Sequence, residues 1–460
     1  MKTKLAFTAV SIGLLLLALC GMSAADDFKY IVNPPRVQVS SGVVPHGIPF
    51  CSSQIICYSP DFIRTAYNFP SNLDGAGQTI LIVDAFGSPT IKNDLAEFDR
   101  LFGIPDPPSF TILCPQGCPS SSFNNMHHDV LGWAFETSLD VEYAHAMAPG
   151  ANIVLVVAAT NSGNAINVAE AKAIQLYPNS IMSQSFGVPE ILIHGNNAQV
   201  IQAQKNFQAA QAANITVLAS TGDFGATNGF STANASFPAS DPLVTAVGGT
   251  EGNPYIPVGT TQNCPAGQTC DVGLATIMGP CVTGPLFVSP CTPVGYGGEQ
   301  VWNEPAFNPG ATTGGAPSRL FGVPSYQNGL GLTTRTIPDV SYNAAINGGV
   351  LVFTSFLGSP AFFVVGGTSA GSPQWASIVA LANQSAGKAL GFLNPAIYGL
   401  AHSAAYANDF HDITVGNNQM TGTPVGFSAT PGWDDATGWG TPNVANLVPD
   451  LVKCATASCP

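Results

Sequence analysis

Short apolar segments alternate with amphipathic segments from about Gly77 onwards, and this alternation restricts the possible folds more than any other feature of the chain. β-Strands are predicted over the short apolar runs 79–83, 153–157, 181–185, 216–219 and 243–247. α-Helices are predicted over residues 94–102, 135–148, 165–176 and 198–213. The pattern is typical of a doubly wound α/β domain with a mostly parallel sheet and helices on both faces. Because ligands of such sheets bind beyond the carboxyl ends of the strands, a functional site is expected in the loops there.

The alternation lapses over residues 252–298, which are rich in Gly, Pro and Thr and contain four cysteines. This composition predicts a disulfide-pinned surface insertion. Strands are predicted again within residues 349–367, followed by a helix over residues 372–384. Residues 409–442 are rich in Gly, Asp and Thr, which is typical of loops.

Residues 1–25 have the features of a secretory signal peptide. Two lysines precede an apolar run over residues 5–19, and small residues suited to cleavage follow at 23–25. Cys20 leaves a lipoprotein signal open as an alternative, although Leu19 stands where a small residue is usual. No later segment reaches the roughly 18 to 20 apolar residues of a membrane span. We therefore expect a secreted, extracellular monomer that does not bind membranes once the signal is removed.

Charge and cysteine usage agree with export. The chain has 13 Lys and Arg against 27 Asp and Glu, so it lacks the cations that nucleic-acid binding requires. A chain with so few cations would also suffer little charge repulsion in an acidic medium. The same composition fits a protein whose acidic surface only keeps it soluble. Ten cysteines beyond Cys20 fall into close pairs that suggest local disulfides. The pairs are 51/57, 114/118, 264/270, 281/291 and 454/459. A zinc site is the weaker alternative, because no CxxC pair occurs.

A candidate nucleophile stands in the sequence GGTSAGSP, over residues 366–373. An apolar strand over residues 362–365 leads into two glycines, and Ser369 then precedes a predicted helix. This order places the Ser369 hydroxyl on a tight turn at a helix N-terminus, where unpaired amides favour developing negative charge. The alternative is a serine that only caps the helix.

A candidate base is a pair of carboxyls rather than a histidine. Glu136 and Asp140 are four residues apart on one predicted helix, so they share a face and can hydrogen-bond in series. Such a pair can accept a serine proton at low pH, where a histidine would already be charged. The alternative is a solvated acidic face.

A third carboxyl, Asp223, follows the predicted strand over residues 216–219. Its loop lies at the carboxyl end of that strand, where this fold builds active sites. The alternative is a turn aspartate between two glycines, which is common.

Taken together, these residues resemble the sedolisin family of serine-carboxyl peptidases, which has a subtilisin-like fold. The resemblance extends from about Tyr58 to Pro442. It includes five ordered motifs besides the nucleophile turn: LDVEYAHAMAPG at 139–150, SQSFG at 183–187 with Glu190, FPASDPLVTAVGGT at 237–250, VWNE at 301–304 and PDVS at 338–341.

The resemblance assigns a role to each candidate residue. Ser369 would be the nucleophile, Glu136 the general base and acid, and Asp140 the residue that orients Glu136 and shares its proton. Asp223, when protonated, would donate a hydrogen bond to the oxyanion, with the Ser369 amide as the second donor. Residues 183–187 resemble the segment along which an extended substrate lies. Asp84 is interpreted as structural or close to substrate.

The resemblance also implies one Ca²⁺ site near the C-terminus. Its ligands would be the carboxylates of Asp412 and Asp434 and the main-chain oxygens of Ile413, Thr430 and Gly432, which form a set of hard oxygen donors. Thr430 stands where the family usually has glycine, but its carbonyl remains available.

The predicted organisation is a short N-terminal segment over residues 26–58, a catalytic domain over 59–453 with the calcium region at 409–442, and a tail over 454–460. The segment 26–58 is too short for the folded prodomain that this family usually carries. The predicted function is a secreted, acid-active endopeptidase acting on proteins or peptides. Two alternatives stay open: an inactive exported relative that binds other molecules, and a His-dependent subtilisin, which the missing His-Gly-Thr motif disfavours.

Overall fold

The computed structural model describes residues 27–32, 34–40, 57–119, 128–193, 197–252, 295–306 and 310–459. The predicted signal peptide and nearly all of the predicted insertion lie outside these residues. None of the helices that the model describes is long and apolar enough to cross a membrane.

The core of the molecule is an eight-stranded sheet in the order β11-β10-β8-β6-β3-β5-β4, with β14 also paired to β10. Every pairing in it is parallel except that of β10 with β11. Its strands are β3 (Thr79–Ala85), β4 (Phe110–Leu113), β5 (Asn152–Ala158), β6 (Ile181–Gln184), β8 (Thr216–Ser220), β10 (Thr245–Glu251), β11 (Gln300–Val301) and β14 (Val340–Asn343). The predicted mostly parallel sheet is therefore confirmed.

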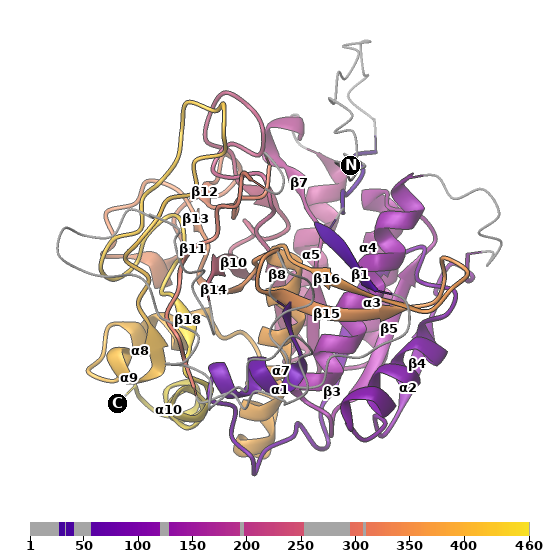
Figure 1. Cartoon of the computed structure of the whole chain (residues 1–460). Helices are drawn as coiled ribbons and strands as arrows, with labels where there is room; N and C mark the ends of the chain where they lie inside the picture. Colours follow the sequence, from indigo (N-terminus) through magenta and orange to yellow (C-terminus); the bar gives the residue numbers. More distant parts are fainter. Residues whose placement is uncertain are drawn as a thin grey trace, which may run out of the picture.

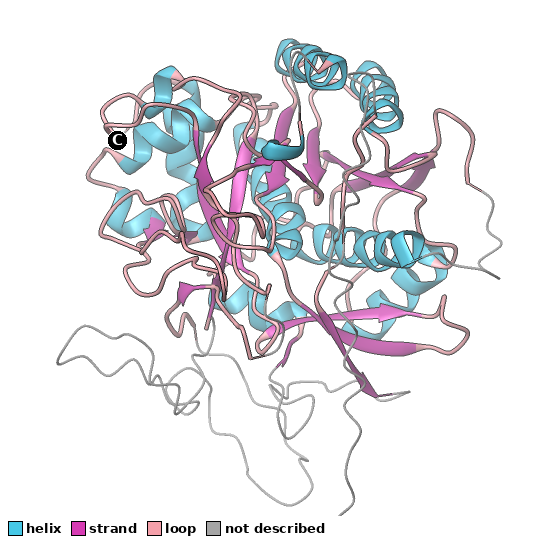
Figure 2. Ribbon diagram, turned by 90° about the horizontal axis from the view of Figure 1, so that it is seen from above, coloured by secondary structure: helices cyan, strands magenta, loops and turns pink. Residues whose placement is uncertain are grey.

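Helices cover both faces of this sheet, as Figures 1 and 2 show. Successive side chains of β3 point to opposite faces of the sheet. Ile80 and Ile82 pack with residues of α3 and α7, whereas Leu81 and Val83 pack with residues of α4 and α5. The helices are α1 (Pro60–Ala66), α2 (Ile91–Phe102), α3 (His128–Met147), α4 (Gly163–Leu176), α5 (Ala198–Ala212), α7 (Gly371–Ala386), α8 (Asn394–Ala401), α9 (Tyr406–Asp409) and α10 (Val444–Thr456). This arrangement is the predicted doubly wound α/β fold.

A second sheet of four strands lies in the order β1-β16-β15-β2. It contains β1 (Arg36–Ser40), β2 (Cys57–Tyr58), β15 (Gly349–Thr354) and β16 (Ala361–Val365). β16 pairs antiparallel with both β1 and β15, and it leads directly into the serine turn. Three two-stranded pairs complete the strands: β7 (Val188–Pro189) with β9 (Ser236–Phe237), β12 (Ala316–Pro317) with β13 (Thr336–Ile337), and β17 (Phe410–His411) with β18 (Thr441–Pro442).

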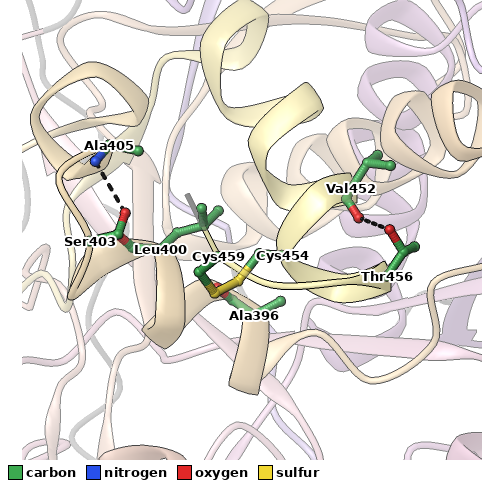
Figure 3. Close-up of a disulfide and its surroundings, with 8 residues drawn as sticks. All are labelled: Ala396, Leu400, Ser403, Ala405, Val452, Cys454, Thr456 and Cys459. Carbon is green, nitrogen blue, oxygen red and sulfur yellow. Dashed lines mark hydrogen bonds between the residues drawn. A yellow bond between two sulfur atoms is a disulfide. The ribbon is translucent and has the colours of Figure 1, made fainter.

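Two of the five predicted cysteine pairs are disulfides in the described residues, Cys114–Cys118 and Cys454–Cys459. Figure 3 shows the second bridge beside α8, where Cys454 Sγ lies 3.4 Å from the carbonyl oxygen of Ala396. The bridge links the end of α10 to the tail that follows it and lies against Gly399 of α8. The other three predicted pairs each include a cysteine outside the described residues.

The motif at 338–341 joins elements of the core. Both oxygens of the Asp339 carboxylate receive hydrogen bonds from the buried guanidinium of Arg335. The same carboxylate accepts from the Ala246 amide of β10 at 2.7 Å and from the Tyr398 hydroxyl of α8 at 2.7 Å. A buried ion pair needs such additional partners to offset the loss of water. This motif is therefore structural, and it fixes β14 beside β10.

Candidate active site

The predicted nucleophile lies on the turn that the sequence indicates. β16 ends at Val365, and the short 3₁₀ helix η3 (Thr368–Ala370) precedes α7. Gly367 has a φ of 99°, and a Cβ there would lie 2.6 Å from Asp223 Oδ2, so the turn requires glycine. Ser369 is only 7% exposed, and its Oγ donates a hydrogen bond to the Ser185 carbonyl oxygen at 3.4 Å.

Glu136 lies on α3, fully buried and beside Ser369. Burial raises the pKa of Glu136 well above its ordinary range, and the Ser369 hydroxyl is close enough to oppose this shift. The Ser369 hydroxyl nevertheless points to Ser185, and neither Glu136 oxygen has a partner of standard hydrogen-bond geometry in the described part of the chain. Such a bond often tightens only when substrate binds. The structure thus brings the predicted nucleophile and base together.

Asp140 and Asp84 complete a buried carboxyl cluster with Glu136. All three side chains are fully buried. Burial raises the pKa of Asp140 well above its ordinary range, and the charges of Glu136 and Asp84 raise it further. Burial likewise raises the pKa of Asp84 to about 7, and the nearby Thr137 hydroxyl opposes that shift. Carboxyls packed in this way cannot all ionise, so they titrate as a unit and share protons.

Asp223 lies on the other side of the serine turn. Its Oδ1 accepts hydrogen bonds from the Thr368 amide at 2.8 Å and the Thr368 hydroxyl at 2.9 Å. Its Oδ2 lies against Gly367. Burial raises the pKa of Asp223, and the two Thr368 donors oppose that shift. A proton on Oδ2 would give this side of the turn a hydrogen-bond donor.

The segment 183–187 also meets the serine turn. Ser183 Oγ lies 2.8 Å from Ser372 Oγ, and Ser185 Oγ donates to the Ser369 carbonyl oxygen at 3.3 Å. The predicted substrate segment is therefore fixed directly beside the predicted nucleophile.

The described histidines whose side chains are placed have partners away from Ser369. His145 contacts the Pro105 carbonyl oxygen at 2.9 Å and the Asp99 carboxylate at 3.3 Å. His411 stacks on Tyr296 with ring centroids 3.6 Å apart. Among the described residues, the side chains beside Ser369 that could accept its proton are therefore carboxyls.

The predicted calcium residues gather at one loop. The Gly432 amide donates to Asp412 Oδ2 at 3.0 Å, which brings this carboxylate to the loop that contains Asp434. Asp434 accepts hydrogen bonds from the amides of Thr430 at 3.0 Å and Thr437 at 2.8 Å. No group of three or more His, Cys, Asp or Glu side chains suited to a metal occurs among the described residues. The two carboxylates are hard oxygen donors that suit a cation such as Ca²⁺, which would need main-chain oxygens for its remaining ligands.

No pattern in the sequence indicates that Arg36 approaches this site. Its guanidinium lies 4.0 Å from the centre of the Phe135 ring. Burial lowers the pKa of Arg36 to about 10, and the charge of Glu136 opposes that shift. Arg36 is 100 residues before Glu136 in the chain, so only the tertiary fold brings the two together. The sequence places Asp84 at the end of its strand, and only the tertiary fold brings it into the carboxyl cluster.

The doubly wound sheet, with a serine turn between a strand and a helix, has the subtilisin-like fold. The chain belongs to the subtilase family, whose model matches residues 127–440, and it is similar to members of the sedolisin family. It is 32% identical to kumamolisin of Bacillus sp. (strain MN-32) over 88% of this chain, and it spans 65% of kumamolisin's length. It is 29% identical to tripeptidyl-peptidase 1 of Rattus norvegicus over 93% of this chain and 69% of that protein.

A solved structure supports the same assignment. The structure of Pseudomonas sedolisin, described as a serine-carboxyl proteinase in complex with pseudo-iodotyrostatin, superposes with a TM-score of 0.67 at 25% identity. The match covers 88% of this chain and 99% of that one. The predicted resemblance to the sedolisin family is therefore confirmed.

Proposed function

We propose that this chain is a secreted, acid-active serine endopeptidase that cuts proteins or peptides through an acyl-enzyme. The main support is the contact between the Ser369 hydroxyl and a buried carboxyl cluster, with Asp223 on the other side of the turn. Export rests on the predicted signal peptide at residues 1–25.

In the first half-reaction Ser369 Oγ attacks the substrate carbonyl carbon, and its proton passes to Glu136. The base is the partly ionised carboxyl cluster, in which Asp140 orients Glu136 and shares the proton. Protonated Asp223 and the Ser369 amide donate hydrogen bonds to the oxyanion. Glu136 then returns the proton to the leaving amine as the peptide C–N bond breaks.

Water resolves the acyl-enzyme by the same route. Glu136 accepts a proton from the water as its oxygen attacks the ester carbonyl carbon. The proton then returns to Ser369 Oγ as the ester bond breaks, which restores the enzyme and releases a carboxylic acid.

The pH dependence of casein or haemoglobin digestion by the full chain tests this proposal. Activity should peak well below pH 7, because the cluster must lose a proton while Asp223 must keep one. Asp223→Asn should lower activity roughly 10²–10³-fold at the optimum, the usual cost of disturbing an oxyanion donor. It should also flatten the decline towards neutral pH, because an amide donates at any pH. An unchanged decline in Asp223→Asn would contradict the role of Asp223.

We also propose one bound Ca²⁺ held by Asp412, Asp434 and the main-chain oxygens of Ile413, Thr430 and Gly432. Chelator should lower the melting temperature by a few degrees, since an ion at 100 times its Kd stabilises the folded state by about 2.7 kcal/mol. Asp434→Ala should be less stable and insensitive to chelator. Asp435→Ala, which alters the neighbouring carboxyl outside the predicted ligand set, should remain sensitive. Equal melting curves with and without chelator in the unsubstituted chain would remove the calcium assignment.

A further inference from the structure

The motif at 301–304 leads into a pair of short segments that reach both sides of the serine turn. Residues 302–304 and 311–313, here called the brace, pair antiparallel. The Glu304 amide donates a hydrogen bond to the Ala311 carbonyl oxygen at 2.8 Å. Because backbone hydrogen bonds join the two segments, a contact made by one of them also fixes the other.

The Glu304 side chain holds the loop 344–348, which lies between β14 and β15. Its Oε2 accepts hydrogen bonds from the Trp302 indole nitrogen at 2.9 Å and from the Ile346 amide, and its Oε1 accepts from the Asn347 amide at 2.9 Å. The apolar side chains of the brace and the loop form a small buried cluster: Trp302, Ala311, Ala344 and Ile346. The carboxyl therefore joins the brace to the loop where the two already pack together.

The same loop contacts the serine turn. The Gly367 amide donates a hydrogen bond to the Ala344 carbonyl oxygen at 2.8 Å. A Cβ at Gly366 would lie 2.5 Å from the Ala345 carbonyl oxygen, so the loop and the turn touch there. Because these two glycines come just before Ser369, the position of the loop sets the position of the Ser369 hydroxyl.

The other segment of the brace holds the loop that contains Asp223. The Thr312 amide donates to the Asp223 carbonyl oxygen at 3.1 Å, and the Gly225 amide donates to the Thr312 carbonyl oxygen at 2.9 Å. The Asp223 side chain in turn accepts two hydrogen bonds from Thr368 of the serine turn. The brace thus contacts the Asp223 loop directly and the serine turn through the loop 344–348.

We propose that Glu304 is a positioning residue of the peptidase, which sets the spacing between Ser369 and Asp223 by holding the loop 344–348 against the serine turn. The inference rests on the proposed peptidase function. The oxyanion must reach the Ser369 amide and the Asp223 carboxyl together, with each donor about 2.7–3.1 Å away. A displacement of about 1 Å can slow a reaction roughly 100-fold. A residue that fixes this spacing therefore governs the chemical step through the backbone.

The kinetics of peptide hydrolysis by full-length variants at the acidic optimum test the inference. Glu304→Ala should lower kcat about 10- to 100-fold. KM should change less than about threefold, because other contacts fix the predicted substrate segment 183–187. Glu304→Gln should keep kcat within about fivefold, since its amide oxygen can still accept from Trp302 and Ile346. The amide also resembles the protonated carboxyl that burial favours there in acid, because burial raises the pKa of Glu304.

Asp94→Ala is the matched control for loss of stability. The Asp94 carboxyl also accepts three hydrogen bonds, one from the Thr90 hydroxyl and two from the amide and hydroxyl of Ser355. Ser355 follows β15, at the end of the β15–β16 pair that lies away from the serine turn. Asp94→Ala should lower the melting temperature about as much as Glu304→Ala but keep kcat within about twofold. Equal losses of kcat in the two variants would assign the effect to stability and overturn the inference.

Glu304→Asp keeps the test conclusive where Glu304→Ala does not fold. Aspartate retains the carboxyl but withdraws it by one methylene, so it cannot reach the indole and both loop amides together. Its kcat should fall about tenfold, below that of Glu304→Gln. A Glu304→Asp variant as active as the unsubstituted chain would contradict the positioning role.

Hydrogen exchange gives a readout that needs no catalysis. In the Ser369→Ala background, adding Glu304→Ala should speed exchange of the amides at 366–368 about tenfold or more, because the Gly367 amide loses its fixed acceptor. Adding Asp94→Ala should leave this exchange unchanged. Unchanged exchange on adding Glu304→Ala would overturn the inference, as would an unchanged kcat.

The two proposals fail in different ways. Faster exchange at the turn without Ser369-dependent hydrolysis at any pH would support the role of Glu304 in holding the turn and overturn the peptidase. Ser369-dependent hydrolysis, with a kcat and an exchange rate that ignore Glu304, would leave the peptidase and overturn the positioning role.

Discussion

Ser369→Ala should have no measurable peptidase activity at any pH, a loss of roughly 10⁴-fold or more in kcat. The hydroxyl of Ser369 lies on the turn between β16 and α7, beside the buried carboxyl of Glu136. Alanine removes the attacking oxygen without altering the glycines that shape the turn. Folding should be unaffected, and circular dichroism of the variant checks this.

Glu136→Gln should lose nearly as much activity, because an amide of the same shape cannot accept the serine proton. Glu142→Gln is a matched control on the same helix. Its carboxyl is also buried, but it accepts a hydrogen bond from the Phe353 amide at 3.0 Å, away from Ser369. The control should keep activity within a few-fold. A fully active Glu136→Gln with an optimum near pH 8 would reject the carboxyl mechanism in favour of a histidine.

Thermal stability should fall as the pH rises from 4 to 8, by several kcal/mol in total. Burial raises the pKa of Asp84, Glu170 and Glu304 to about 7 each. A carboxyl whose pKa is higher in the folded state contributes stability below its unfolded pKa, near 4.5 for glutamate. That stability is lost as the pH rises through the folded pKa. For Glu170, raising the pKa from 4.5 to about 7 corresponds to roughly 3 kcal/mol.

The pH dependence of stability is measured by denaturing the Ser369→Ala variant, which cannot digest itself. Chelator is present throughout. Adding Glu170→Gln should make the stability curve shallower, because the amide does not titrate. Adding Glu97→Gln should leave the curve unchanged, since that carboxyl is exposed beside Arg100. A chain that is as stable at pH 8 as at pH 4 would contradict the prediction and weaken the case for acid function.

The central α/β layers could be predicted from the sequence because local periodicity encodes them. Apolar runs such as 153–157 and the helical pattern of 165–176 carry their own signal, and the observed β5 and α4 differ from them by a few residues at most. The prediction was least accurate where tertiary packing decides at which residue a helix or strand begins or ends. α3 begins at His128 rather than 135, and β10 continues through Gly248 and Gly249 to Glu251 because β14 and β11 pair with it there.

The candidate site was likewise predictable from the sequence only in part. The sequence by itself determined the serine turn, since two glycines between a strand and a helix leave few conformations, and it determined the i, i+4 relation of Glu136 and Asp140. Only the tertiary structure decided that Asp84 joins those carboxyls and that Arg36 lies near Glu136. Local patterns report neighbours within a few residues, whereas these contacts join segments separated by about 50 to 100 residues. Such contacts form only when burial of the shared core offsets the entropy lost in closing long loops.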